Sequence, residues 1–173
     1  MEAVAFLVET IFKLYLMVVM LRLWLQLAQA DFYNPLSQFI VKVTHPIIGP
    51  LRRVIPSIGR FDTATFVFAL VIALANIWVI AAINGFMLTN VFWILKNALV
   101  MLLVEGVQLI IYVLIIRAIL SWVSQGNNPL EFLFQQLTEP MIAPIRRIIP
   151  PIGGLDLSPM ILIIFLLFIM RLF

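Results

Sequence analysis

The chain alternates between long apolar stretches and shorter polar segments that contain proline. The apolar stretches are long and hold few charged residues, which is typical of helices that cross a membrane. At ~1.5 Å per residue, about 20 apolar residues cross the ~30 Å hydrocarbon core of a bilayer. The pattern therefore predicts four transmembrane helices, at residues 3–28, 65–83, 91–123 and from 158 onward. The fourth can extend only ~22 Å by residue 173, so we expect it to be incomplete at its C-terminal end.

All ten prolines lie in two segments, residues 35–56 and 129–159. Because proline interrupts helices and lipid tolerates no unpaired backbone, we expect both segments at the membrane surface or under a protein cover. Each begins with apolar residues at i, i+3, i+4 and i+7, which predicts a short amphipathic helix that ends at the proline break. Such a helix can lie in the membrane interface or pack onto the transmembrane bundle, and the pattern favours neither. The predicted short elements are residues 36–47 and 51–55 in the first segment, and 130–141 and 145–149 in the second.

A long internal repeat relates the two proline segments. Residues 34–62 align without a gap to residues 128–156, which lie 94 positions later, and 14 of the 29 positions are identical. An identity of this length predicts a duplicated unit. We therefore expect an all-α membrane protein with four transmembrane helices, arranged as two parallel-oriented two-helix repeats, each with a proline-rich cytoplasmic loop. The predicted division is a first repeat (1–84), a short outer linker (85–94) and a second repeat (95–173).

The composition agrees with a membrane protein and excludes several kinds of site. The chain is 64% hydrophobic and 11% charged, whereas a soluble domain is about half apolar and about a quarter charged. It has no cysteine and one histidine, which excludes disulfides, thiolate metal sites and covalent haem attachment. No nucleotide-binding loop or hydrolase motif occurs. We therefore expect no enzyme activity, no metal and no cofactor, and the net charge of +3 predicts no nucleic-acid partner.

The distribution of lysine and arginine predicts the orientation in the membrane. The two repeated segments, residues 34–62 and 128–156, carry six of these residues, whereas residues 84–94 and the first twelve residues carry none. Positively charged loops stay in the cytoplasm. Both proline segments are therefore predicted to be cytoplasmic, with both chain termini outside.

Six arginines are candidate binding residues because they occupy equivalent positions in the two repeats. Four of them form two adjacent pairs in the proline segments, and the other two lie toward the cytoplasmic ends of the first and third predicted spans. A guanidinium can bind two phosphate oxygens at once, so the pairs suit anionic lipid headgroups or the acidic surface of a partner. Topology signals and interfacial anchors have the same composition, and both interpretations stay open. The candidates are Arg52, Arg53, Arg146, Arg147, Arg22 and Arg117.

Polar residues inside the predicted spans form a second candidate group. Glu9 and Lys13 are spaced for an i,i+4 ion pair, and Glu105 and Gln108 lie near the middle of the third span. An ionisable group at the bilayer centre costs at least ~2.5 kcal/mol, so it usually has a role. One interpretation is an ion or proton path through Glu105, Lys13 and Glu9. The other is a buried pair between Glu105 and Lys13 that fixes helix packing.

The repeated segment resembles the YggT family of bacterial membrane proteins, which also has plastid relatives. The resemblance rests on N-P-L, then T-x-P-I-I-G-P-L-R-R-V-I-P-x-I-G from Thr44 to Gly59, followed by an acidic residue and an apolar span. The doubled arrangement is similar to the two-repeat proteobacterial form. The resemblance implies a multi-pass envelope protein of the bacterial inner membrane that is not an enzyme. It also implies links to osmotic or ion homeostasis, to cell division and membrane morphology, and, in plastids, to cytochrome maturation.

Two hypotheses follow for the function. In the first, the protein is a scaffold or membrane-organisation factor whose two arginine segments bind anionic headgroups or a membrane-protein partner. In the second, it is a small channel or transporter component in which Glu105 and Lys13 line a path. Four weakly polar spans are few for a pore, so the second hypothesis requires a homo-oligomer.

Overall fold

The computed structural model describes residues 2–123, 128–149 and 156–172, and regular structure in these residues is helical. Three of the helices are long and apolar enough to cross a membrane, and the last helix is apolar but has 13 residues. The spans predicted at residues 3–28, 65–83 and 91–123 are therefore confirmed as helices of sufficient length. The helices are α1 (Glu2–Leu27), α2 (Pro35–Val54), α3 (Thr63–Ile83), α4 (Val91–Val123), α5 (Pro129–Ile148) and α6 (Ser158–Met170).

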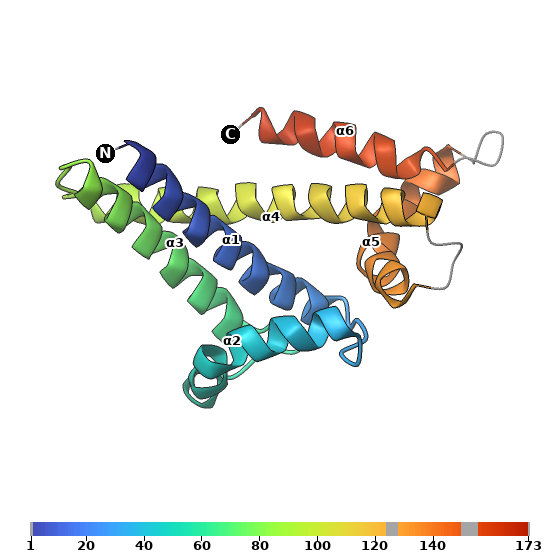
Figure 1. Ribbon diagram of the computed structural model, residues 1–173, viewed down its shortest axis with the longest axis horizontal. Coiled ribbons are helices and arrows are strands. Elements are labelled where there is room, and N and C mark those ends of the chain that lie inside the picture. Colours follow the sequence, from blue (N-terminus) through green and yellow to red (C-terminus); the bar gives the residue numbers. More distant parts are fainter. Residues whose placement is uncertain (1, 124–127, 150–155, 173) are drawn as a thin grey trace.

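The helices of each repeat are arranged in the same way (Figure 1). In the first repeat, α1 and α3 lie side by side and antiparallel, and α2 crosses the ends where α1 stops and α3 begins. In the second repeat, α6 runs back along α4, and α5 lies at the end where α4 stops. Both chain termini lie toward one end of the molecule, and α2 and α5 lie toward the other. This arrangement is consistent with two repeats in the same orientation.

The prolines do not break α2 and α5, so the prediction of two short elements in each segment was wrong. Pro46 and Pro50 lie inside α2, and Pro140 and Pro144 lie inside α5. In α2, proline removes the hydrogen bonds to the carbonyls of Lys42 and Pro46, four residues earlier. Lys42, Pro46 and Pro50 all lie on the exposed side of α2, so water or headgroups can reach the unpaired carbonyls. The helix therefore continues through the prolines and bends, as Figure 1 shows for α2.

Side chains cap the helices that follow the loops. The Oδ1 atoms of Asn34 and Asn128 accept hydrogen bonds from backbone N–H groups two residues later, at the starts of α2 and α5. Asp62 caps α3 by accepting from the N–H of Thr65. At the start of α6, Leu157 occupies the cap position and offers no side-chain acceptor, and Asp156 accepts a hydrogen bond from the backbone N–H of Ser158. Polar side chains thus satisfy the first N–H groups of α2, α3 and α5.

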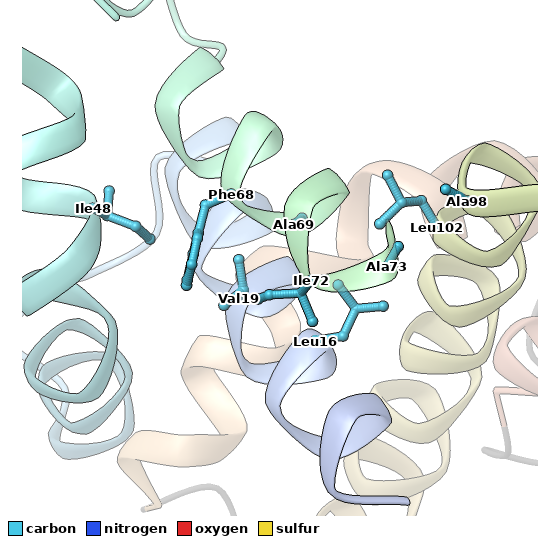
Figure 2. Close-up of a cluster of buried hydrophobic side chains, with 9 residues drawn as sticks. All are labelled: Leu16, Val19, Ile48, Phe68, Ala69, Ile72, Ala73, Ala98 and Leu102. Carbon is cyan, nitrogen blue, oxygen red and sulfur yellow. The ribbon is translucent and has the colours of Figure 1, made fainter. Parts of the chain in front are cut away.

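The hydrophobic core is itself repeated. Figure 2 shows the core of the first repeat, where α1, α2 and α3 contribute residues and Ala98 and Leu102 reach in from α4. A second cluster packs α4, α5 and α6 together in the same manner. Five buried positions of the first cluster recur in the second, at offsets of 94 or 95 residues. They are Leu16, Val19, Ile48, Phe68 and Ile72 in the first repeat, and Ile111, Leu114, Ile142, Leu162 and Leu166 in the second.

A third cluster joins the two repeats. It contains residues of α1, α2, α4 and α5, among them Leu25, Leu109 and Leu137. Helix α4 approaches α1 closely at Gly106, where a Cβ atom would lie 3.1 Å from Cε of Met20. The absence of a side chain at Gly106 therefore makes room for Met20. Both α2 and α5 pack onto the bundle, but one apolar stripe of α2 stays exposed, at Phe39, Val43 and Ile47.

Candidate functional site

The first arginine of the first pair is held by an acid at the start of α3. Arg52 donates from Nη2 to Oδ2 of Asp62 and, at 2.6 Å, to Oε1 of Gln26. The Asp62 side chain is fully buried and also accepts from the hydroxyl of Thr65. Burial alone would raise the pKa of Asp62, but the hydrogen bonds from Arg52 and Thr65 outweigh it and hold the pKa below its ordinary value. Arg52 therefore ties the end of α2 to the start of α3.

The second repeat makes the equivalent link with one more acid. Arg146 donates from Nε to Oδ2 of Asp156 at 2.9 Å and from Nη1 to Oε1 of Glu139 at 2.6 Å. Burial raises the pKa of each acid, but bonds from Arg146 and Ser158 to Asp156, and from Arg146 and Arg117 to Glu139, lower both below their ordinary values. In the first repeat, His45 occupies the position equivalent to Glu139, and Arg52 binds Gln26 instead. The link between the two helices is thus repeated with different partners.

The arginines near the ends of α1 and α4 also bind inside the protein. Arg22 is buried and donates from Nη1 to the hydroxyl of Thr44 at 2.6 Å. Arg117 donates in the same way to Thr138 at 2.5 Å and also binds Glu139. Both threonines lie in the middle of the helices that contain the prolines. Arg22 and Arg117 therefore connect each long helix to the crossing helix and are not open to a ligand.

The second arginine of each pair faces away from the protein. Arg53 and Arg147 are exposed, and within the described ranges neither has an ion pair or a side-chain hydrogen bond. Each is followed by a strongly exposed aliphatic residue, Val54 at 80% and Ile148 at 81%. The two pairs lie in the last turns of α2 and α5, just before the connections that lead to α3 and α6. Each repeat thus presents one free guanidinium next to one free aliphatic side chain.

The polar residues of the spans lie together between α1 and α4. Nζ of Lys13 is 2.8 Å from Oε1 of Glu9 and 3.8 Å from Oε1 of Glu105. Glu105 is buried, and its Oε2 has no hydrogen-bond partner in the described part of the chain. Gln108 does not join this group, because its Nε2 donates to the hydroxyl of Tyr112 at 2.6 Å. The structure therefore brings together three of the four residues and leaves Gln108 one turn away.

A cavity opens beside this group at the end of the molecule that holds the termini. It has a volume of about 610 Å³ and is lined by Glu9, Asn76 and mainly apolar residues of α3, α4 and the connection between them. The Nδ2 atom of Asn76 is buried and has no partner among the described residues. No group of three or more His, Asp or Glu side chains in residues 2–123, 128–149 and 156–172 is placed to hold a metal ion. The cavity thus combines the carboxylate of Glu9 and the unsatisfied amide of Asn76 with a mainly apolar wall, which also includes Asn84, Thr89 and Asn90.

The family model described as CCB3/YggT matches residues 1–83 and 96–173 of the chain. The chain belongs to the CCB3/YggT family. This YggT-family chain is 55% identical over 170 residues to an uncharacterised Vibrio alginolyticus protein of the proC 3′ region. The alignment covers 97% of the chain and 91% of that protein. The chain is 47% identical to YggT of Escherichia coli K12, an uncharacterised protein, covering 96% of the chain and 86% of that protein.

A third relative is an uncharacterised Pseudomonas aeruginosa protein, which is 40% identical and covers 91% of the YggT-family chain and 81% of its own length. No solved structure matches the chain. The two matched segments of the family model are consistent with an internal repeat. The resemblance stated from the residues is therefore confirmed at the level of the family.

Some residues of the arginine clusters were not predicted as partners. Thr44 and Thr138 bind the buried arginines, and Asp62 and Asp156 bind the first arginines of the pairs. Thr44 matches Thr138 and Asp62 matches Asp156 in the two repeats. The alignment of the YggT-family chain with itself therefore already marked these residues as candidate partners. Glu139 was not marked in this way, because its equivalent is His45. Only the structure shows that Glu139 lies between Arg117 and Arg146.

Proposed function

We propose that this YggT-family protein is a non-enzymatic organiser of the bacterial inner membrane that binds anionic phospholipid headgroups at the cytoplasmic ends of α2 and α5. One observation carries the proposal: Arg53 and Arg147, at equivalent positions of the repeats, are exposed and lack a partner among the described residues. The other four candidate arginines are engaged within the protein. Two free guanidinium groups at equivalent positions of the two repeats favour two ligands of the same kind.

The chemistry of the two positions fits a phospholipid at the membrane surface. A guanidinium can bind two phosphate oxygens with two parallel hydrogen bonds. Val54 and Ile148 follow the two arginines and are about four-fifths exposed, so they can insert among acyl chains while the arginine stays at headgroup level. Each basic residue near an anionic membrane surface contributes about 1 kcal/mol. Two sites in one protein would hold neighbouring lipids at a defined spacing, which is a means of organising the membrane.

The test compares two double variants that lose the same charge. Arg53→Gln with Arg147→Gln removes the free guanidinium groups, whereas Lys42→Gln with Arg60→Gln removes two exposed charges near the same end that have no basic equivalent in the second repeat. Each protein is placed in nanodiscs that contain phosphatidylglycerol and phosphatidylcholine, and native mass spectrometry counts the phosphatidylglycerol molecules retained. We expect the first variant to lose retained phosphatidylglycerol and the second to keep most of it.

Equal retention in both variants would contradict specific headgroup binding by Arg53 and Arg147. If retention is equal but the arginine variant alone loses a co-purifying acidic membrane protein, the two positions bind a protein partner instead. Melting temperatures of the variants in the same nanodiscs serve as the folding control. We expect them to stay close to the parent value, because neither double variant removes an ion pair of the described residues.

A second candidate function, a small ion-conducting component in osmotic or ion homeostasis, is favoured by the group around Glu105. The buried carboxylate has one oxygen near Lys13 and one without a partner, and a cavity beside the group reaches Glu9. A proton or cation exchanged at Glu105 would need this free oxygen. The test is proton and potassium flux in liposomes, with Glu105→Gln as the variant and Asn97→Leu as a control in the same helix, because among the described residues Asn97 bonds only to the carbonyl of Trp93 one turn earlier. Flux that is lost only in Glu105→Gln would support conduction, and absence of flux from the inserted parent protein would rule it out.

A further inference from the structure

The contact between the two repeats uses different faces of equivalent helices. The second repeat contributes face A, which consists of apolar residues of α4 and α5 that pack onto the first repeat. The first repeat contributes face B, on the C-terminal half of α1. Face A of the second repeat consists of Leu102, Leu109, Leu133 and Leu137, and face B of the first repeat consists of Met20, Leu21 and Trp24. A contact of this kind is heterologous, because each repeat uses a different surface.

The same faces exist on the other repeat, where no residue of the described ranges buries them. Positions equivalent to face A lie on α1 and α2, 95 and 94 residues earlier in the chain. They are large hydrophobic residues with high exposure, whereas face A of the second repeat is almost fully buried. Exposures are 60% for Leu7, 60% for Leu14, 57% for Phe39 and 38% for Val43, against 4% for Leu102, 8% for Leu109, 1% for Leu133 and 1% for Leu137.

Face B is likewise uncovered in the second repeat. Its equivalents lie on α4, 95 residues after face B of the first repeat, and all are isoleucines. Their exposures are 41% for Ile115, 43% for Ile116 and 50% for Ile119. Within one chain, face A of the second repeat is therefore packed onto face B of the first repeat. Face A of the first repeat and face B of the second repeat lie at equivalent positions but have no such contact among the described residues.

Lipid contact explains exposed apolar residues in general, but it does not explain this difference between the repeats. Val71 of α3 and its equivalent Phe165 of α6 are both exposed, at 52% and 56%, which is the pattern of a surface that faces lipid in both repeats. Face A is instead buried in one repeat and exposed in the other, and face B is partly buried in one repeat and exposed in the other. Because lipid supplies no hydrophobic driving force, association in the bilayer depends on packing and on polar contacts.

Polar residues add such a contact to the uncovered faces. In the joined pair, Lys13 of the first repeat lies 3.8 Å from Glu105 of the second. The equivalent positions in the uncovered faces are Gln108, on the α4 side, and Thr10, on the α1 side. Among the described residues, Gln108 bonds only within its own helix, where Nε2 donates to the hydroxyl of Tyr112 and leaves its second N–H near the middle of the span. The hydroxyl of Thr10 already donates to the carbonyl of Phe6, but the Thr10 oxygen of another copy could accept from this N–H, away from lipid.

We propose that a second copy of this chain binds through these faces, with face A of the first repeat in one copy packed onto face B of the second repeat in the other. The contact repeats the one already present inside the chain. Two copies joined twice in this way form the smallest closed assembly that leaves neither face uncovered. This proposal does not depend on headgroup binding, because faces A and B contain none of the arginines.

The joined faces identify a pair of residues for cross-linking. Met20 lies directly over Gly106 in the chain, and the equivalents of these two positions are Ile115 and Ile11. The chain has no cysteine, so introduced thiols give the only disulfides. Two differently tagged proteins, one with Ile11→Cys and one with Ile115→Cys, are co-expressed and the membranes are oxidised with copper phenanthroline. We expect a cross-linked product of twice the chain mass that carries both tags.

The matched control replaces Ile11→Cys by Val71→Cys, which has similar exposure on the lipid-facing side of α3. We expect a several-fold lower yield from Val71→Cys with Ile115→Cys, and little product when either Ile11→Cys or Ile115→Cys is expressed alone. Equal yields from the two pairs would overturn the proposal, as would a predominant product that links two Ile115→Cys chains. Because these exposed isoleucines make no described core contact, the variants should melt at the parent temperature.

Discussion

At the residue scale, Asp62 and Asp156 hold equivalent positions in different surroundings. The Asp62 side chain is fully buried, whereas that of Asp156 is 31% exposed. We expect Asp62→Asn to lower the free energy of unfolding by about 1–3 kcal/mol, because the Arg52 guanidinium loses its charged acceptor. Asp156→Asn should cost less, since water and Glu139 remain available to Arg146. Thermal unfolding in one detergent, followed by tryptophan fluorescence, measures both effects.

The same carboxyl predicts how stability depends on pH. The pKa of Asp62 in the folded protein is below its ordinary value of 3.8, so the folded state favours the charged form. The stabilisation is complete above 3.8 and is lost as the pH falls through the lower, folded-state pKa. We expect the melting temperature to drop over this acidic range, and to drop less in Asp62→Asn. If the melting temperature falls with pH equally steeply in Asp62→Asn and in the parent protein, Asp62 contributes nothing to acid sensitivity.

The arginine pairs were evident from the sequence, but the separate roles of their members were not. Adjacent residues of a helix point about 100° apart, so one member of a pair can face the protein while the next faces outward. Which member faces Asp62 depends on how α2 bends and where the turn places α3. Neither feature can be read from the R-R motif. The division into bound Arg52 and free Arg53 therefore required the structure.

At the element scale, the caps of α2 and α5 differ in one contact. Asn34 and Asn128 both cap their helices, but Nδ2 of Asn34 also donates to the carbonyl of Pro129 in the second repeat, at 2.8 Å. We expect Asn34→Ala to lower the free energy of unfolding by about 1 kcal/mol through loss of the cap. Loss of the hydrogen bond between the repeats should lower it by about 1 kcal/mol more. Asn128→Ala should cost only the first amount.

Asn34→Asp separates the two contributions in the same melting experiment. Aspartate caps a helix as well as asparagine does, but it cannot donate to the carbonyl of Pro129. Its melting temperature should therefore lie between those of the parent and Asn34→Ala. If Asn34→Ala and Asn128→Ala melt together, the hydrogen bond between the repeats has no measurable effect on stability.

The helices were largely predictable from the sequence, except that α2 and α5 continue through their prolines. The long apolar stretches predicted the spans, because the length and composition of a stretch are local properties. Whether a helix continues past Pro46 and Pro50 depends on the surroundings of two unpaired carbonyls. Those carbonyls are tolerated here because they face outward, and a sequence does not show which side of α2 is covered.

At the scale of the whole molecule, the repeat was visible in the sequence but the contact between the repeats was not. Helices that are apolar on every side carry no stripe that marks the packed face. Leu14 and Leu109 are the same residue at equivalent positions, yet one is exposed and the other is buried. The difference arises because only one repeat has a neighbour on that side within the chain. Whether such a residue is buried therefore depends on the presence of a neighbouring repeat and not on the residue type.

The charges predict an orientation of the whole molecule in the membrane, and the last prediction tests it. The free arginines and the exposed Lys42 lie toward the end that holds α2 and α5, whereas the connection between α3 and α4 carries no basic residue. Positive charge is retained in the cytoplasm. In intact cells, a membrane-impermeant maleimide should therefore label Thr89→Cys, in the outer connection, and should not label Ser57→Cys. After permeabilisation both should react, since both positions are exposed and no native cysteine competes. The reverse pattern would place Arg53 and Arg147 outside the cell, away from the cytoplasmic leaflet and its strongly anionic surface, and would remove the basis for the proposed headgroup sites.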